Sequence, residues 1–369
     1  MENILPWFAL KNVPGIGNHL FKRLIACFNS PENVFEASGE DLLKVKGITP
    51  RLITSIKHHK IRDPVKKDFD LVMKKGYKIV TMSDKDYPPL LLQIPDPPPF
   101  LYVFGRLNGS FKNIAVVGSR NATQYGISTT RRLCRDLASL KMTIVSGMAI
   151  GIDSAAHQGA LTGKGNTIAV LGSGLEIVYP AENRELFHRI AEHGAVISEF
   201  PLLTEPEPHN FPIRNRIISG ISLGTVVVEA TKRSGSLITA RLAAEQNREV
   251  FAIPGSIHSF KSTGTHTLIK QGAKLVEHAQ DIMEELSYII GAPHEKDTTG
   301  NEIMERTSQL SSEESLVFEA IGAYPVHIDE LARKLSMKPG KLSSILLHLE
   351  LKGIVHQSPG KLFSREAME

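Results

Sequence analysis

Short apolar runs alternate with helical stretches from about residue 77 to residue 277, and this alternation constrains the fold more than any other feature. The runs are YKIVTM, PFLYVFG, NIAVVGS, MTIVSG, NTIAVLGSG, GAVISEF, GTVVVEA, EVFAIPGS and AKLVE. Most of them are separated by a segment long enough for a helix, such as Asp153 to Leu161 or Arg184 to His193. Strands that are apolar throughout and are joined by helices form a parallel sheet with helices on both faces. The sequence therefore predicts an α/β fold.

Two smaller regions flank the predicted sheet. Residues 1–64 are predicted to be helical, because VPGIGNHLFKRLIACF places a Gly-x-Gly turn before apolar residues at helical spacing, and a weaker copy surrounds Gly47. Such a turn either holds a nucleic-acid phosphate on its amides or serves only a protein contact. Residues 65–290 hold the sheet, and the polar stretch 291–312 is predicted to be a linker. Residues 313–369 predict three helices and a hairpin, which is typical of a winged helix.

The composition is that of an ordinary globular protein, with 41% hydrophobic and 22% charged residues. The formal net charge of +4 permits an anionic partner without requiring one. Cys27 and Cys134 lie far apart and lack the spacing of metal ligands, which favours reduced thiols. The N-terminus shows no secretory signal, and no stretch approaches the roughly 20 apolar residues that span a bilayer. We therefore expect a cytoplasmic protein without a membrane segment.

Small-residue turns follow several of the predicted strands. They contain Gly118 and Ser119, Ser146 and Gly147, Gly151 and Asp153, Gly172 and Gly174, and Ser234, Gly235 and Ser236. In a parallel sheet these turns meet at the carboxyl edge, where ligands bind in open α/β folds. Glycine lets backbone amides approach an anion, and the N-terminus of the following helix adds a positive end. Together the turns favour a phosphate-rich ligand, although each turn alone is also explained by a tight strand-to-helix connection.

Basic side chains accompany the same turns. They are Arg120, Arg214, Arg216, Lys232 and Arg233. A guanidinium binds phosphate through two hydrogen bonds and does not lose its charge. Cations spread over several loops suit an extended polyanion better than a single nucleotide. The alternative is structural, in which Arg120 or Arg216 pairs with Glu199 or Glu229 and holds the sheet edge together.

The specific motifs of nucleotide chemistry are absent from the sequence. Gly172-Ser173-Gly174 is followed by Ile177 where a dinucleotide-binding fingerprint needs its third glycine, and no P-loop, G-x-S-x-G elbow or HExxH motif is present. The motifs therefore support neither NAD binding nor ATP hydrolysis, and we expect no cofactor and no metal. Asp153 and His157 lie four residues apart and form either an acid–base pair or, as we favour, a helix cap and its neighbour.

The turns belong to longer motifs that together identify a family. GSRNATQYG, SGMAIGIDSAAHQGAL, TIAVLGSGLEIVYPAENRELF, SEFP, FPIRNRIISG and VVVEATKRSGSLITARLAAEQNREVFAIPGS follow in this order between about residue 99 and residue 280. They resemble the DNA-processing protein A family, also called DprA or Smf. The resemblance implies an extended Rossmann-type, mostly parallel sheet, flanked by a helix-hairpin-helix or SAM-like helical domain and a winged helix. It also implies a homodimer through the central domain and no catalytic activity.

The resemblance further implies a function in natural transformation and homologous recombination. Members of the family bind single-stranded DNA with little sequence preference, protect it, and load the RecA recombinase onto it past single-strand-binding protein. On this pattern the phosphate contacts come from Arg120, Arg214, Arg216, Lys232 and Arg233, and Phe211 stacks on a base. The rest of the predicted DNA-binding set is Gly118, Ser119, Ser146, Gly147, Gly151, Asp153, Gly172, Gly174, Asn215, Ser234, Gly235 and Ser236. Ala181 departs from the pattern, because family members sometimes carry a basic residue there.

Two other functions use a sheet of this kind. Nucleoside-monophosphate phosphoribohydrolases carry a Pro-Gly-Gly-x-Gly-Thr-x-x-Glu loop, but this chain reads SLGTVVVE, without the Pro-Gly-Gly and with Glu229 one residue too far along. A sensor of a nucleotide messenger is the other alternative. In the winged helix, Lys338, Lys341, Ser344 and His348 are predicted to face outward, toward either DNA or a protein.

Overall fold

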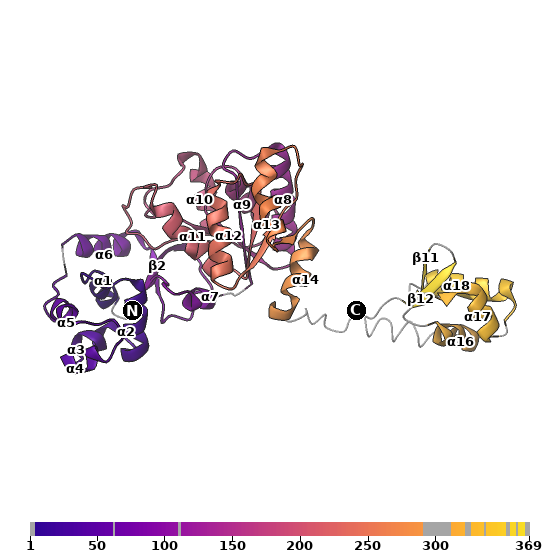
Figure 1. Cartoon of the computed structure of the whole chain (residues 1–369), viewed down its shortest axis with the longest axis horizontal. Coiled ribbons are helices and arrows are strands. Elements are labelled where there is room, and N and C mark those ends of the chain that lie inside the picture. The colour runs from indigo at the N-terminus through magenta and orange to yellow at the C-terminus, as the bar shows by residue number, and fades with distance from the viewer. Residues whose placement is uncertain are drawn as a thin grey trace. The chain divides into compact units, whose positions relative to one another are not determined.

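The computed structural model describes residues 4–61, 63–109, 112–290, 311–321, 326–335, 337–351, 355–358 and 361–365. The chain divides into two compact units, Met1–Ser287 and Tyr288–Glu369 (Figure 1). The first unit contains the sheet and the N-terminal helices, and the second contains three further helices and a small sheet. Among the described residues, no helix is both long and apolar enough to span a membrane.

A nine-stranded sheet forms the centre of the first unit, in the order β1-β2-β6-β5-β4-β3-β7-β8-β9. The strands are β1 (Lys78–Thr81), β2 (Phe100–Gly105), β3 (Asn113–Gly118), β4 (Thr143–Ser146), β5 (Thr167–Val170), β6 (Gly194–Ser198), β7 (Gly224–Val228), β8 (Glu249–Ala252) and β9 (Lys274–Leu275). From β6 to β9 all neighbours are parallel, whereas β2 pairs antiparallel with β1 and β6. Each strand coincides with one predicted apolar run, so the α/β prediction is confirmed. The strands β4, β5 and β7 are buried throughout, which explains why they are apolar rather than alternating.

Helices cover both faces of this sheet. The chain places α8 (Gln124–Ser139), α9 (Ile152–Thr162) and α10 (Arg184–His193) after β3, β4 and β5, and α9 packs between its two neighbours. After β6 the chain returns across the sheet and forms α11 (Asn210–Gly220), α12 (Gly235–Glu245) and α13 (Thr263–Lys270), and α14 (Ala279–Ile290) follows β9. Because strand–helix–strand connections are right-handed, this reversal places the second group of helices on the opposite face. The reversal also makes β3 and β7 neighbours.

The N-terminal helices contain two turns of the same kind. The helices are α1 (Leu5–Lys11), α2 (Asn18–Phe28), α3 (Pro31–Glu36), α4 (Gly39–Leu43), α5 (Pro50–Lys57) and α6 (Asp63–Lys75), with α7 (Pro89–Gln93) after β1. Gly15 before α2 has a φ of +91° and Gly47 before α5 has a φ of +101°, a backbone conformation that favours glycine. A side chain at Gly15 would also lie 2.6 Å from Leu52 Cδ2. These glycines explain the repeated sequence pattern, and the helix-hairpin-helix class itself stays a prediction.

The N-terminal helices share their hydrophobic core with the sheet. The Phe8 ring stacks on Phe100 at 4.6 Å between centroids and meets Tyr102 edge-on at 6.0 Å. Lys11 Nζ donates a hydrogen bond to the backbone oxygen of Glu199 at 2.9 Å. The boundary expected between residues 64 and 65 lies within α6, and the helices on either side of it contribute to the same hydrophobic core as the sheet.

The second unit has a core of its own and the architecture of a winged helix, as predicted. Its elements are α16 (Ser312–Ala320), β10 (Val326–His327), α17 (Ile328–Leu335), α18 (Pro339–Leu351), β11 (Val355–Ser358) and β12 (Leu362–Arg365). The sequence did not predict β10, which pairs with β12. The exposed Lys341 on α18 forms an ion pair with Glu313. Residues 291–310 of the predicted linker, and Pro359 and Gly360 of the predicted hairpin, lie outside the described residues.

Candidate functional site

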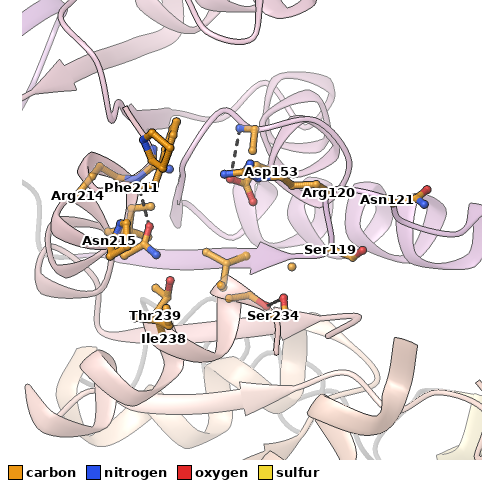
Figure 2. Close-up of a pocket in the computed structure, with 18 of the residues that line it drawn as sticks. Ser119, Arg120, Asn121, Asp153, Phe211, Arg214, Asn215, Ser234, Ile238 and Thr239 are labelled. Atoms are coloured by element: carbon orange, nitrogen blue, oxygen red, sulfur yellow. Dashed lines mark hydrogen bonds between the residues drawn. The ribbon is translucent and has the colours of Figure 1, made fainter. Parts of the chain in front are cut away.

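A cleft of about 620 Å³ opens at the carboxyl edge of the sheet, where β3 and β7 lie side by side. The order of the strands reverses between these two, and such a switch point is where ligands bind in open α/β sheets. The loops after β3, β4 and β7 line the cleft together with the first turns of α11 and α12 (Figure 2). Of the predicted residues it contains Gly118, Ser119, Arg120, Asp153, Phe211, Arg214, Asn215, Ser234, Gly235 and Ser236.

The loop after β3 is held in place by Glu229. The Glu229 carboxylate accepts hydrogen bonds from Thr123 N at 2.8 Å and from the Thr123 hydroxyl, which also caps α8. Gly151 supports the loop from the other side, because a side chain there would overlap the carbonyl oxygens of Ser119 and Arg120. These contacts fix the backbone of the loop, while the Arg120 side chain is exposed.

Arg214 lines the cleft although the residue is only 4% exposed. Its Nη1 atom donates to Gly147 O at 2.9 Å and to Val170 O, and its Nε atom donates to Asn215 Oδ1 at 3.2 Å. Gly147 leaves room for the guanidinium, since a side chain there would lie 2.7 Å from Arg214 Nη2. Burial lowers the pKa of Arg214 to about 10, so the side chain remains a cation at neutral pH.

Phe211 contacts two guanidinium groups. The Cζ atoms of Arg120 and Arg214 lie 5.2 Å and 5.8 Å from its ring centroid, within the range of a cation–π interaction (Figure 2). The Tyr179 ring lies 5.8 Å away at a tilt of 43°. Gly172 makes room for Phe211, because a side chain at this glycine would lie 2.8 Å from the Phe211 Cδ1 atom. The ring of Phe211 is therefore shared between Arg120 and Arg214.

The first turn of α12 supplies backbone amides to the cleft. Its N-cap residue Ser234 and the residues Gly235, Ser236 and Thr239 line the cavity. The hydroxyl oxygens of Ser234 and Ser236 lie 2.8 Å apart in a hydrogen bond. The first N–H groups of a helix have no partner within the helix and carry the positive end of its dipole. Together with the two guanidinium groups, they suit this edge of the cleft to a phosphate.

Arg216 lies apart from the cleft lining. Its Nη2 atom pairs with Glu199 Oε2 at 2.5 Å, its Nε atom pairs with Asp96 Oδ2 at 3.2 Å, and its Nη1 atom donates to Asp96 O at 2.8 Å. The structure thus realises the structural alternative for this arginine, which braces α11 against the end of β6. Arg214 and Arg216 separate because residues two positions apart on a helix face different sides.

Asp153 and His157 occupy separate environments, and the described hydrogen bonds do not join them. The N-cap of α9 is Gly151, so the prediction that Asp153 caps this helix was wrong; Asp153 lies in the first turn and accepts from Ala149 N at 3.4 Å. Burial raises the pKa of Asp153. His157 is fully buried with Nδ1 2.7 Å from Thr167 Oγ1, and burial lowers its pKa to about 3. Neither side chain is poised to exchange a proton with the other.

The other predicted residues lie around the cleft lining. Ser146 donates its hydroxyl to Val116 O at 2.7 Å inside the sheet, and a side chain at Gly174 would overlap the backbone of Leu202. Lys232 and Arg233 are exposed on the loop after β7. The sequence did not predict Asn121, Tyr179, Pro206, Pro208, Thr231, Ile238 and Thr239, which also line the cleft. Of these, Tyr179 had a usable signal, as an aromatic beside a proline shortly after Gly174.

Metal ligands do not gather in the described part of the chain, where no three or more His, Cys, Asp and Glu side chains are placed to hold an ion. Glu229, which the phosphoribohydrolase alternative needs as a reactive carboxylate, is engaged by Thr123. The chemistry of the cleft is therefore that of cations, hydroxyls, amides and the Asp153 carboxyl group around a half-buried aromatic ring.

Known proteins share both units of this chain. A family model described as DNA recombination-mediator protein A matches residues 78–287, and one described as the DprA winged helix domain matches residues 304–361. Protein Smf of Synechocystis is 35% identical over 97% of this chain and 98% of its own length. DNA processing protein DprA of Bacillus subtilis is 43% identical over 57% of this chain and 72% of its own length.

Two solved structures resemble much of this chain. DNA processing protein A from Streptococcus pneumoniae aligns with a TM-score of 0.66 and 35% identity, over 77% of this chain and 99% of that one. DNA processing protein A from Helicobacter pylori, described for its single-stranded DNA binding mode, aligns with a TM-score of 0.51 and 29% identity, over 57% of this chain and 96% of that one. The sequence, the fold and the matched regions agree, and the chain belongs to the DNA recombination-mediator protein A family.

Proposed function

We propose that this chain binds single-stranded DNA, with little sequence preference, through the cleft at the carboxyl edge of its sheet. The observation that carries the proposal is the pair of guanidinium groups around Phe211. Arg120 is exposed, and Arg214 donates its hydrogen bonds to the neutral oxygens of Gly147, Val170 and Asn215. A phosphate adds negative charge beside these donors, whose carboxylate neighbour is the buried Asp153, and the aromatic ring offers a surface to a base.

The related structure from Helicobacter pylori supports this proposal, because its description concerns single-stranded DNA binding. Aromatic residues make up only 6% of this chain, so phosphate contacts dominate over stacking. Binding that depends on phosphate contacts releases counterions and weakens steeply as salt increases. The same property explains indifference to sequence, since every nucleotide presents the same backbone.

A titration of labelled oligothymidylate at two salt concentrations tests the proposal. Arg120→Ala removes an exposed cation without disturbing the core, and we expect several-fold weaker binding and a salt slope reduced by about one. Arg189→Ala is the matched control, because Arg189 is exposed on α10 outside the cleft lining. Binding that is insensitive to salt and to Arg120→Ala, or release of free base from nucleoside monophosphates, contradicts the proposal.

The finer parts of the function rest on family membership. We propose that the chain acts without catalysis, as a homodimer through the central domain, and loads the RecA recombinase onto single-stranded DNA that single-strand-binding protein covers. Sedimentation at micromolar concentration tests the dimer, and a single-chain species contradicts it. The rate of RecA filament formation on covered DNA, with and without this chain, tests the loading. Unchanged rates under conditions where the chain binds the DNA contradict it.

A further inference from the structure

The loop that follows β8 presents two apolar side chains to solvent. Ile257 is 82% exposed and Phe260, at the start of a 3-10 turn (Phe260–Ser262), is 67% exposed. Exposed apolar side chains on one loop indicate a binding surface more often than apolar side chains scattered singly over the surface do. The loop lies at the same carboxyl edge of the sheet as the cleft, one strand beyond β7.

Hydrogen bonds hold this loop from both ends. His266 Nε2 lies 3.0 Å from Gly255 O, and Gly264 N donates to Ala230 O at 2.7 Å, on the loop after β7. Gly255 leaves no room for a side chain, which would overlap the Ser262 hydroxyl. The exposed side chains are therefore carried by a backbone of defined shape, as a stacking platform requires.

The loop is also joined directly to the lining of the cleft. Lys261 Nζ donates to the backbone oxygen of Asn121, which lines the cleft. The Tyr125 hydroxyl, on α8, donates to Pro254 O at 3.0 Å, and its residue is 53% exposed. A surface with exposed aromatic side chains thus continues outward from the cleft toward β8.

The charge of this surface selects a polyanion as its occupant. Residues 97–135, 230–244 and 250–276 contain no aspartate or glutamate. These segments include the loops after β3, β7 and β8, and they bring Arg120, Lys232, Arg233 and Lys261 to one edge. Cations interleaved with exposed aromatics are the combination that binds single strands.

We propose that Phe260, on the same loop as Ile257, forms a second stacking site outside the cleft, on which a base of the same DNA strand rests. This inference depends on the proposed function. The strand leaves the cleft past the loop after β7, where Lys232 and Arg233 are exposed, and its next bases reach the loop after β8. Phe260 offers its exposed ring, and Ile257 adds exposed apolar area on the same loop.

Oligothymidylates of graded length, from about four to about sixteen nucleotides, test the second site. We expect Phe260→Ala to leave the affinity for the shortest oligonucleotides unchanged and to weaken that for the longest about tenfold. Phe260→Trp keeps a stacking surface and restores the affinity. Tyr288→Ala, which removes an exposed aromatic from α14, is the matched control and leaves both affinities unchanged.

Abasic substitution gives an independent reading. If a base stacks on Phe260, one abasic position in a long oligonucleotide abolishes the difference between wild type and Phe260→Ala, whereas abasic positions elsewhere preserve it. An equal loss at all lengths, together with a smaller species in sedimentation, identifies Phe260 as a protein contact and overturns the inference. Arg120→Ala separates the two proposals, because it weakens short and long oligonucleotides alike if the cleft binds DNA. If Arg120→Ala weakens DNA binding and Phe260→Ala does not, the result contradicts the second stacking site but not DNA binding in the cleft.

Discussion

Arg214 and Arg216 lie two positions apart on α11 and are almost equally buried, at 4% and 8% exposure, yet their surroundings differ in charge. Arg216 meets two carboxylates, those of Glu199 and Asp96. Arg214 donates to neutral oxygens and shares Phe211 with the cation Arg120. The comparison teaches that burial alone does not distinguish a structural arginine from a binding one. The local balance of charge does.

On the cleft side of α11, nearby negative charge only partly balances the buried positive charge of Arg214. Burial lowers the pKa of Arg214 to about 10, and the neighbouring charge of Asp153 only partly opposes this shift. Burial also raises the pKa of Asp153. In the proposed function, a bound phosphate adds negative charge beside the Arg214 guanidinium, whereas Glu199 and Asp96 balance Arg216 without a ligand.

The largest expected effect is on stability, and it separates the two arginines. Arg216→Met leaves the buried Glu199 carboxylate without its guanidinium partner, and the loss of one member of a buried ion pair costs about 3–5 kcal/mol of unfolding free energy. We expect a smaller loss for Arg214→Met, which removes a cation that burial disfavours and leaves carbonyl oxygens without a donor. The Asp153 carboxyl also loses its cation, but burial already raises its pKa, so a proton can neutralise it.

Urea unfolding of both variants, with Arg189→Met as the exposed control, measures this difference. The DNA titration gives the reverse order, because Arg214→Met removes a cation from the cleft lining and Arg216→Met does not. Equal losses of stability, or equal losses of DNA affinity in variants that remain folded, contradict the different roles assigned to Arg214 and Arg216.

The sequence predicted the fold more accurately than it predicted the different roles of Arg214 and Arg216. The parallel strands were recognisable because they are buried on both faces and therefore apolar throughout. The two-residue strand β10 was missed, because it is defined by its pairing with β12 rather than by a pattern. The roles of Arg214 and Arg216 depend on partners that only the fold brings close. Glu199 is 17 residues away from Arg216 in sequence, and Asp96 is 120 residues away.

The site was predictable by residue type and less so by geometry. Glycine-rich turns and arginines were expected at the carboxyl edge, and the cleft gathers many of them. No local pattern showed that the missing side chains of Gly147 and Gly172 make room for Arg214 and Phe211. The hydrogen bond between Glu229 and Thr123 also joins residues 106 positions apart, so no local pattern showed that Glu229 holds a loop.

An effect of intermediate size is the pH dependence of the unfolding free energy, which tests the charge balance on the cleft side of α11. His157 is buried near Arg214, and burial and then that positive charge lower its pKa from 6.5 to about 3. Between these values the unfolded chain binds more protons than the folded one, so the unfolding free energy decreases as pH falls. The decrease is about 1.4 kcal/mol per pH unit, or about 2 kcal/mol from pH 6.5 to about pH 5.

Unfolding of wild type and His157→Gln across this pH range isolates the contribution of the histidine. Gln does not titrate, so we expect the unfolding free energy of the variant to vary less with pH. The contribution of neutral His157 to the wild-type unfolding free energy is fully present above pH 6.5 and is lost as the pH falls toward 3. Parallel profiles contradict the assignment and imply that water or a nearby carboxylate accommodates the imidazolium. In that case, more negative charge surrounds the cleft side of α11 than the comparison of Arg214 with Arg216 implies.

The smallest expected effect comes from the cations that lie outside the cleft lining. Lys232 and Arg233 are both exposed, so replacing either by Ala changes the unfolding free energy by less than about 0.5 kcal/mol. If the DNA strand passes over the loop after β7, each substitution removes one phosphate contact and lowers the salt slope of binding by about one. Arg241→Ala is the control, because Arg241 is exposed in the body of α12 and pairs with Glu245. A slope that decreases for Arg120→Ala but not for Lys232→Ala or Arg233→Ala confines the DNA to the cleft. A slope that decreases for all three places a continuous line of phosphates along the sheet edge, from the buried cation of α11 out to the exposed ones.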